Sequence, residues 1–183
     1  LRDGGFNAAE MRAENYTARQ LRDGGFSTRE CLSCFTIREL KDSGIEASDL
    51  RGAGLSCAML AAPVVGFTWV QLREAGYTAQ EVSEVHGCRL EQLKGAGYSL
   101  AEIKALGYSS AELKATGFTV EQLRVEGSFS ALELKEAGCT AEELVGGGYK
   151  VRQLKLVGFS AASFKEFGFM PAALRQVSQS VSQ

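Results

Sequence analysis

One ten-residue pattern is written twice in succession between Gly107 and Glu126, first as GYSSAELKAT and then as GFTVEQLRVE. Self-similarity at a fixed spacing is the signature of a repeat protein, in which each repeat packs on its neighbours. We number this frame from its glycine: Gly at position 1, an aromatic residue at 2, Ser or Thr at 3, Glu or Gln at 6, Leu at 7 and Lys or Arg at 8. The frame extends over nearly all of the 183 residues.

The frame is too regular to arise by chance. It occurs seventeen times, and twelve of the sixteen intervals between successive copies are ten residues long. Position 7 is apolar in every copy, and thirteen of the sixteen aromatic residues stand at position 2. These two rows predict the core of the repeat. The core residues assigned from the sequence are Leu21, Leu40, Leu72, Leu93, Leu113, Leu123, Leu144, Leu154, Phe26, Phe118 and Phe159.

Each copy carries the start and stop signals of a short helix. Ser109 is a good N-cap, because its hydroxyl can accept a hydrogen bond from a free amide of the first turn. Glu112 completes a capping box with it, and Tyr108 and Leu113 form the apolar staple that often accompanies the box. Gly117 supplies the left-handed residue that ends a helix. The pattern therefore predicts a two-turn helix of about seven or eight residues.

A helix this short is marginal in water on its own, so the repeats have to stack. Stacking buries the Leu and aromatic rows continuously, as in other solenoid proteins. We therefore expect an all-α solenoid of about seventeen short helices over residues 1–176, irregular at 57–66 and followed by a polar tail at 177–183. Because the chain begins in the middle of a repeat, we also expect it to be an excerpt of a longer protein.

Two family resemblances follow from these residues. The Gly-aromatic-Ser/Thr-x-x-Glu-Leu-Lys frame resembles decapeptide arrays found in algal and other protist proteins, a likeness that implies no fixed chemistry. Large apolar residues also recur every five positions, as at Leu113, Phe118 and Leu123. That spacing resembles the pentapeptide-repeat family, which would imply a right-handed β-helix. This family has Asp or Asn where the present chain has Gly, Glu or Gln, and Glu, Gln, Lys and Ala favour helix. The β-helix remains the alternative fold.

The composition argues against several classes of function. A formal net charge of -2 and a sequence pI near 5.6 argue against broad binding to phosphate backbones. No stretch approaches the roughly 18 apolar residues of a membrane span. One histidine and five scattered cysteines offer no clustered set of ligands or catalytic groups. We expect no enzyme activity, no catalytic or metal site and no cofactor. The unpatterned cysteines favour a reducing compartment, with the chloroplast as one possibility.

Interruptions of the frame are the places where contacts with partners are expected. The stretch at 57–66 adds two residues, and Pro63 within it cannot continue a helix. Val64 and Val65 in this stretch could contact a neighbour. Trp69 follows at a helical position that is usually small, and the single histidine, His86, stands beside another insertion. We take Val64, Val65, Trp69 and His86 as candidate partner contacts.

Three further motifs each have a structural explanation. The pair Cys31 and Cys34 is half of a zinc site, but the two residues fill the Leu and Gly positions of the frame, which predicts small buried thiols. A disulfide or metal site is the alternative. The bases at position 8 form a row beside the Glu/Gln row, and this predicts a solvated face with balanced charge. Gly146 to Gly148 lacks the Lys-Ser/Thr of a phosphate loop and is interpreted as a loosened helix end.

The function expected from these observations is that of a structural or interaction scaffold. The repeats would form a linker subunit that bridges several proteins in a large assembly. The resemblance to algal arrays points to a photosystem–antenna supercomplex as one specific setting. A nucleic-acid-binding repeat protein and, with the β-helix fold, a DNA mimic are the alternatives.

Overall fold

The structure is a computed structural model that describes residues 4–165. Within this range the chain forms sixteen short helices and no strand. The predicted all-α repeat solenoid is confirmed, and the β-helix alternative is wrong for the described repeats. The physical reason is local, since the amides that would ladder between strands are held by helical turns and side-chain caps. The seventeenth expected helix and the tail at 177–183 lie outside the described residues.

The repeat that begins at Gly107 shows how the local signals act. Helix α11, Ser110–Ala115, begins where the Ser109 hydroxyl accepts from the amide of Glu112, at 3.3 Å. The Glu112 carboxylate accepts in return from the Ser109 amide, at 2.8 Å. The helix ends at Ala115, Gly117 in the following turn has a φ of +80°, and the amide of Phe118 then donates to the carbonyl of Leu113. At six residues, α11 is shorter than predicted because the terminal turn takes up the rest of the repeat.

The contacts divide the chain into two compact units, Leu1–Tyr98 and Ser99–Gln183, and each is described by itself. The first unit contains α1 Ala8–Ala13, α2 Ala18–Asp23, α3 Thr28–Cys31, α4 Ile37–Asp42, α5 Ala47–Gly52, α6 Cys57–Ala61, α7 Trp69–Glu74, α8 Ala79–Ser83 and α9 Leu90–Ala96. The second contains α10 Leu100–Ala105, α11, α12 Val120–Val125, α13 Ala131–Glu136, α14 Ala141–Gly146, α15 Val151–Leu156 and α16 Ala161–Lys165. The irregular stretch at 57–66 falls within the first unit. A single array over 1–176 stays a prediction.

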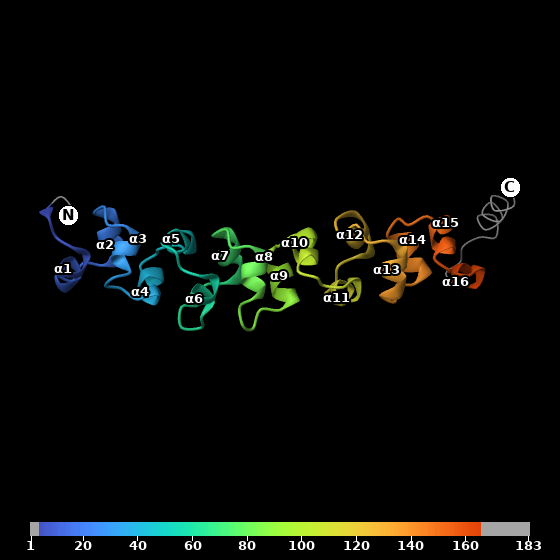
Figure 1. The fold of residues 1–183 in the computed structure, drawn as a ribbon, viewed down its shortest axis with the longest axis horizontal. Helices are drawn as coiled ribbons and strands as arrows, with labels where there is room; N and C mark the ends of the chain where they lie inside the picture. Colours follow the sequence, from blue (N-terminus) through green and yellow to red (C-terminus); the bar gives the residue numbers. More distant parts are fainter. Residues whose placement is uncertain (1–3, 166–183) are drawn as a thin grey trace. The chain divides into compact units, whose positions relative to one another are not determined.

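Within each unit a helix packs against the next helix and also against the one after it. In the first unit α2 contacts α4, α5 contacts α7, and α6 contacts α8. In the second unit α11 contacts α13 and α12 contacts α14. Figure 1 shows the resulting alternation in the first unit, with α4 and α6 on one side and α5 and α7 on the other. The same side of a unit is therefore reached again after two repeats.

Three positions of the frame fill the interior of each unit. Every position-7 residue of the described helices is buried, including Met11 and Cys31 in place of Leu. The aromatic residue at position 2 and the first helical residue, at position 4, pack around this row. The assigned core residues found buried are Leu21, Leu40, Leu72, Leu93, Leu113, Leu123, Leu144, Leu154, Phe26 and Phe118. Phe159 differs, because it is only half-buried and packs at a tilt against Phe164, with ring centroids 6.5 Å apart and an interplanar angle of 59°.

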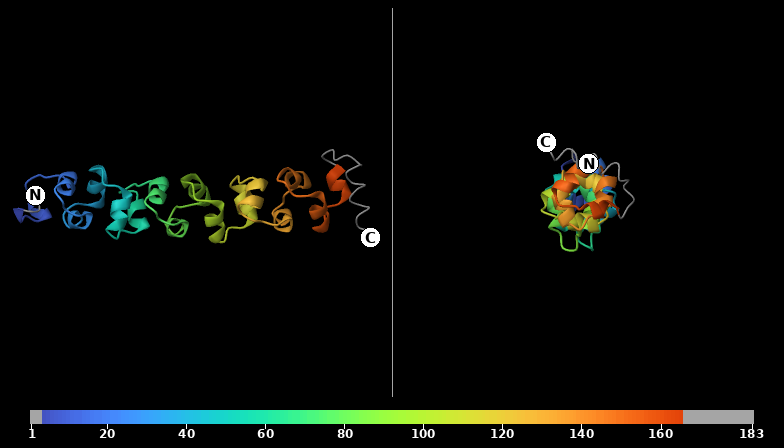
Figure 2. Two further views of the ribbon diagram at one scale, coloured as in Figure 1. Left: turned by 90° about the horizontal axis from the view of Figure 1, so that it is seen from above. Right: turned by 90° about the vertical axis from the view of Figure 1, so that its right-hand side faces the viewer.

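The interruptions of the frame change the turns and leave the stacking intact. After α6 the chain turns at Ala62, whose carbonyl accepts from the amides of both Val65 and Gly66, at 2.8 Å each. The one-residue insertion before Gly87 lengthens the loop after α8 in the same way. Figures 1 and 2 show these two loops projecting on the same side of the first unit, as expected from the contact between α6 and α8.

Candidate interaction surface

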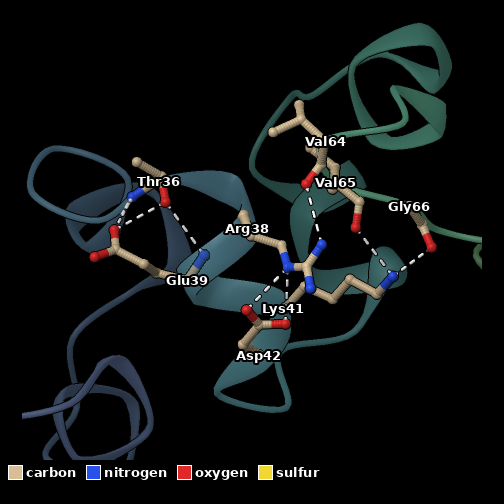
Figure 3. Close-up of polar contacts among 8 residues, drawn as sticks. All are labelled: Thr36, Arg38, Glu39, Lys41, Asp42, Val64, Val65 and Gly66. Carbon is tan, nitrogen blue, oxygen red and sulfur yellow. Dashed lines mark hydrogen bonds and ion pairs between the residues drawn. The ribbon is translucent and has the colours of Figure 1, made fainter.

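The bases at position 8 do not form a simple solvated face. Lys41 of α4 reaches the turn that ends α6, where its ammonium donates to the carbonyl of Val65 at 3.0 Å and also contacts the carbonyl of Gly66 (Figure 3). The ammonium lies 4.7 Å from the centre of the Phe67 ring. Beside it, Arg38 donates to the carbonyl of Val64 at 3.2 Å and pairs with Asp42 at 2.9 Å. The expected solvated face is therefore corrected to a row of cross-links between repeats.

The same cross-link recurs through both units, always from one helix to the turn that ends the second helix along. Arg51 of α5 donates to the carbonyl of Ala75 after α7, at 3.2 Å. In the second unit Arg124 of α12 donates to Gly147 at 2.6 Å, and Lys135 of α13 donates to Val157 at 2.7 Å. We call this contact a brace. The last carbonyls of a helix lack intrahelical donors and carry the negative end of its dipole, so a cation there satisfies and stabilises them.

An aromatic ring and a carboxylate complete many of the braces. Cations lie over position-2 rings in the pairs Arg12–Phe35, Lys41–Phe67, Arg51–Tyr77, Arg73–Tyr98, Lys104–Phe129 and Lys135–Phe159, at 4.1–5.7 Å. Two position-8 bases also pair with the position-6 carboxylate of the helix that follows such a turn. Arg12 pairs with Glu39 at 2.8 Å, and Lys114 pairs with Glu143 at 2.9 Å. Lys114 is the leading cause of a lowered pKa at Glu143.

We use the word junction for such a turn together with its carbonyls, its position-2 residue and the next position-6 side chain. Sequence reasoning missed the braces because their partners lie more than twenty residues apart. The rows themselves gave no reliable signal, because the bases Arg22 and Lys114 stand in the same register before Ile45 and Cys139, neither of them aromatic.

Tyrosine at position 2 adds a second cross-link. The hydroxyl of Tyr98 donates to the carbonyl of Tyr77 at 2.6 Å, and the hydroxyl of Tyr77 donates to the carbonyl of Leu55 at 2.5 Å. Tyr149 makes the equivalent bond to the carbonyl of Phe129. These hydroxyls join successive turns along one side of a unit. They also satisfy polar groups that the stacking has removed from water.

Two surface grooves of the first unit are built from equivalent positions. One, of about 400 Å³, lies between the α1–α2 turn and the α3–α4 turn, and the other, of about 330 Å³, lies between the α4–α5 turn and the α6–α7 turn. They share a position-8 base, two position-2 side chains, a position-6 side chain and a position-9 acid. These are Arg12, Tyr16, Phe35, Glu39 and Asp42 in the first groove, and Lys41, Ile45, Phe67, Gln71 and Glu74 in the second. The same surface therefore recurs three helices along.

The four candidate partner contacts differ in how far they are exposed to solvent. Val64 is 71% exposed in the loop after α6, and His86 is exposed in the loop after α8. The two loops project on the same side of the first unit. Trp69 is half-buried at the start of α7. Val65 is only 5% exposed, because the turn on Ala62 directs it inward, and it is no longer a candidate for an external contact. Met59 and Val70 add exposed apolar side chains at 46% and 44%.

The cysteines occupy structural positions of the frame. Cys31, Cys57 and Cys139 are buried, and all five cysteines are free thiols. Burial raises the pKa of Cys57 to about 11 and also raises the pKa of Cys31. Cys34 is half-buried, and its thiol contacts the carbonyl of Cys31 at 3.5 Å. Over residues 4–165 no three His, Cys, Asp or Glu side chains are grouped as metal ligands would be.

The repeat assigned from the sequence also decides the family. The family described as "decapeptide repeat region" matches residues 5–78, 66–128 and 128–183, which together cover nearly the whole chain. The chain belongs to this family. No match was found among curated proteins or among solved structures. Among the helices described in this decapeptide repeat protein, none has the length and apolar character needed to cross a membrane.

Proposed function

We propose that this decapeptide repeat protein is a non-enzymatic interaction scaffold that bridges other proteins in a large assembly. The observation that carries the proposal is the pair of grooves in the first unit, which are lined by the same frame positions three helices apart. A surface that recurs along one chain can hold several copies of a partner segment, or several related partners, at set spacings. Linked sites of this kind gain avidity without further contacts.

The walls of the grooves are suited to polar segments with an apolar anchor. Each groove is lined by an aromatic ring, Phe35 or Phe67, with a cation over its face. Each also has an acid at position 9, and the second groove adds Glu46, which makes no cap bond to its own helix. Interfaces commonly combine such an apolar centre with a charged rim.

Exposed apolar side chains give a second kind of contact. Val64 and Met59 lie in or beside the loop after α6, and Val70 lies on α7. In the second unit Leu156 is 86% exposed on α15. Exposed apolar side chains can serve as anchors in pockets of partner proteins. A linker role within a photosystem–antenna supercomplex rests on the resemblance to algal arrays alone and stays a prediction.

The brace geometry gives no support to a nucleic-acid-binding role. The bases that would form a contiguous basic surface are turned toward helix ends and carboxylates within each unit, as at Arg124 and Lys114. Binding to a phosphate backbone needs free cations that neutralise the phosphates and so displace the counterions condensed on the nucleic acid. We therefore put forward only the protein-bridging function.

The test is the mass of the native particle that contains the protein. The tagged chain, extracted gently from its source and separated on a density gradient, should travel with a multi-subunit particle. Ser48→Trp, which fills the second groove, should shift a share of it to lower mass. Ala101→Trp, at the same frame position of α10 and outside both grooves, is the matched control. Recovery of the unaltered protein only as a free monomer would refute the scaffold function.

A further inference from the structure

The junction between α3 and α4 contains two thiols and differs from the other junctions of the frame. Cys34 stands at position 1, which is glycine in most copies, and the interval from Gly25 to Cys34 is one residue short. Most position-1 residues have a positive φ, whereas Cys34 does not. Its amide donates to the carbonyl of Cys31 at 3.1 Å, which closes a hydrogen-bonded turn of four residues at the end of the shortest described helix.

This turn holds the two cysteines in the range in which a disulfide can form. A hydrogen-bonded turn brings the Cα atoms of its first and fourth residues within about 7 Å. Disulfide-bonded cysteines have Cα separations of about 4.4–6.8 Å, so no large movement of the backbone is needed to join the sulfurs. The Cys34 thiol lies 3.5 Å from the carbonyl oxygen of Cys31. Burial raises the pKa of Cys31, and Cys34 is the next cause, as expected for two neighbouring thiols.

The two thiols differ in their access to solvent. Cys34 is half-buried, whereas Cys31 is fully buried in the position-7 row. The thiolate is the reactive form of cysteine, and it forms most readily in partly exposed, electropositive surroundings. A reagent in solution therefore meets Cys34 first, and Cys31 is placed to act as the second thiol. Arg22 counteracts part of the effect of burial on the pKa of Cys31 and so favours its thiolate.

The same junction forms part of the first groove. Phe35, the residue after Cys34, lines this groove, and its ring centre lies 4.5 Å from the guanidinium carbon of Arg12. The amide of Phe35 donates to the carbonyl of Cys31 at 2.8 Å. Helix α3 packs against α2 and α5. A bond between the two sulfurs would draw the Cys31 side chain out of the core row, so it would change the packing of α3 and the position of Phe35.

We propose that Cys31 and Cys34 form a redox-active dithiol that small-molecule disulfides of the glutathione class oxidise, and that its oxidation alters the first groove. The Cys34 thiolate attacks one sulfur of the small disulfide, which forms a mixed disulfide and releases one small thiol. The Cys31 thiolate then attacks the Cys34 sulfur and releases the second small thiol. Two protein thiols are thus oxidised to one disulfide, their two protons pass to the two small thiols, and an excess of the small thiol reverses both steps.

The test is mass spectrometry of the full chain after treatment with glutathione disulfide under native conditions. We expect the peptide 30–38 to lose two hydrogen atoms, because both cysteines of the pair lie within it. The number of free thiols should fall from five to three, and dithiothreitol should restore all five. An unchanged peptide, a stable glutathione adduct at Cys34, or a disulfide from Cys34 to any other cysteine would each overturn the proposal.

Two variants test the role assigned to each thiol. Cys31→Val should keep glutathione on Cys34 as a lasting mixed disulfide, because no second thiol displaces it. The frame already has valine at position 7 in Val82, so the fold should be retained. Cys34→Ser should leave Cys31 unmodified, because its sulfur is buried. Cys88→Ser, at a half-buried cysteine outside the pair, is the matched control and should form the disulfide as the parent does.

The change in the groove has its own measurement. Oxidation should shift the NMR amide signals of Arg12 and Phe35 and leave that of Phe67, at the equivalent position of the second groove, in place. Unshifted signals in the oxidised protein, or equal shifts at Phe67, would refute a specific effect on the first groove. Loss of glutathione uptake in Cys31→Val, or of the disulfide in Cys88→Ser, would contradict the order of the two steps.

The outcome is separable from the scaffold function, on which only the importance of the groove rests. A Cys31–Cys34 disulfide in a protein that is recovered only as a free monomer would uphold the dithiol and refute the scaffold. A protein that travels with a large particle but never forms this disulfide would refute the dithiol and leave the scaffold standing.

Discussion

Three consecutive glycines, Gly146, Gly147 and Gly148, have three different roles at the end of α14. Gly146 is the last helical residue, and a methyl group added there would meet nothing within 4 Å. Gly147 has an ordinary φ of -78°, but an added methyl group would overlap the side chain of Val120. Gly148 has a φ of +89°, in the left-handed region where glycine is at no disadvantage. The expected loosened end is in fact a closely packed turn.

This difference predicts opposite effects for two adjacent substitutions. Gly147→Ala should destabilise the second unit by about 1–3 kcal/mol, because Val120 has to move to make room. Gly146→Ala should stabilise it by roughly 0.5–1 kcal/mol, because alanine loses less backbone entropy in a helix. Urea unfolding of the two variants measures both changes. Equal effects of the two substitutions would contradict the packing assigned to Gly147.

The tyrosine hydroxyls give a second prediction for single residues. Tyr98→Phe removes the bond to the carbonyl of Tyr77 and leaves that carbonyl buried without this donor. We expect a loss of about 0.5–1.5 kcal/mol in the free energy of unfolding. Tyr108→Phe is the control, because no hydrogen bond of the Tyr108 hydroxyl is found in the described part of the chain, and it should change stability little. A loss of the same size in both variants would mean that the hydroxyl bond contributes nothing specific.

At the scale of the element, the bounds of each helix are specified by neighbouring residues, but its stability depends on residues far away in the sequence. Six residues joined by a capping box are too short to be stable in isolation. The box side chains, such as Thr36 and Glu39 at α4, decide where the helix begins. The brace from Lys41 then ties this helix to the turn after α6 and covers Phe67. The capping residues decide where the helix forms, and packing on neighbouring helices together with the braces stabilises it.

Removal of one brace should therefore weaken the first unit measurably. Lys41→Met keeps the aliphatic stem and removes the ammonium that bonds the carbonyls of Val65 and Gly66. We expect a loss of about 1–2 kcal/mol, for charge-assisted bonds and a cation–π contact that are part-buried. Lys155→Met, at the exposed position-8 lysine of α15, should stay within about 0.5 kcal/mol of the parent protein. Thermal unfolding of the two variants gives the comparison, and equal losses would contradict the brace.

The helices could be predicted from the sequence because their signals lie within ten residues of one another. Ser109, Glu112 and Gly117 together specify where α11 begins and ends, and no distant residue is needed to predict these bounds. The buried state of Leu113 follows from the same frame. The fold class and the rows of core residues were therefore accessible before any coordinates.

The surface could not be predicted in the same way, because it depends on how far each repeat turns about the axis of its unit. The bond between Arg12 and Glu39 and the groove they line join residues of α1 and α4, and only the superhelix brings them together. Val65 was expected beside Val64 as an external contact, and the direction of one turn buries it. The sequence pattern shows which side chains form a row along successive repeats. The rotation between repeats decides which of these rows contact one another.

At the scale of the whole molecule, the position-6 carboxylates make stability depend on pH. Hydrogen bonds from the cap residues lower the pKa of Glu39, Glu81, Glu112 and Glu133, and Lys114 leads the lowering at Glu143. A carboxyl group whose pKa is lower in the folded state stabilises the fold above its unfolded pKa, near 4.5. That contribution is lost as the pH falls through the lowered value. The protein should thus lose stability below about pH 4.5.

Replacing one such carboxylate in each unit tests this dependence. Glu81→Gln with Glu133→Gln keeps a side chain that can close the capping box, as Gln71 does at α7. The double variant should show a shallower fall of the unfolding free energy between pH 5 and 3, because fewer groups take up protons on unfolding. Denaturant titrations at a series of pH values measure the slope. An unchanged slope would show that these two carboxylates are not the titrating groups.

The contacts found within each unit join a helix to neighbours at most three helices away, so a defect should remain local. Leu134→Ala removes a fully buried side chain from α13 and should cost about 2–5 kcal/mol at that repeat. In a globular core such a loss is shared by the whole domain, but in a repeat array it acts mainly on the interfaces beside it. We expect amide hydrogen exchange to quicken most in α13 and in its contact partners α11 and α15, and to keep its parent rates in α1 to α4. Leu132→Ala, a substitution at a half-exposed side chain on the same helix, should leave all of these rates nearly unchanged. A uniform rise in exchange over both units after Leu134→Ala would show instead that the decapeptide repeats fold as one cooperative body.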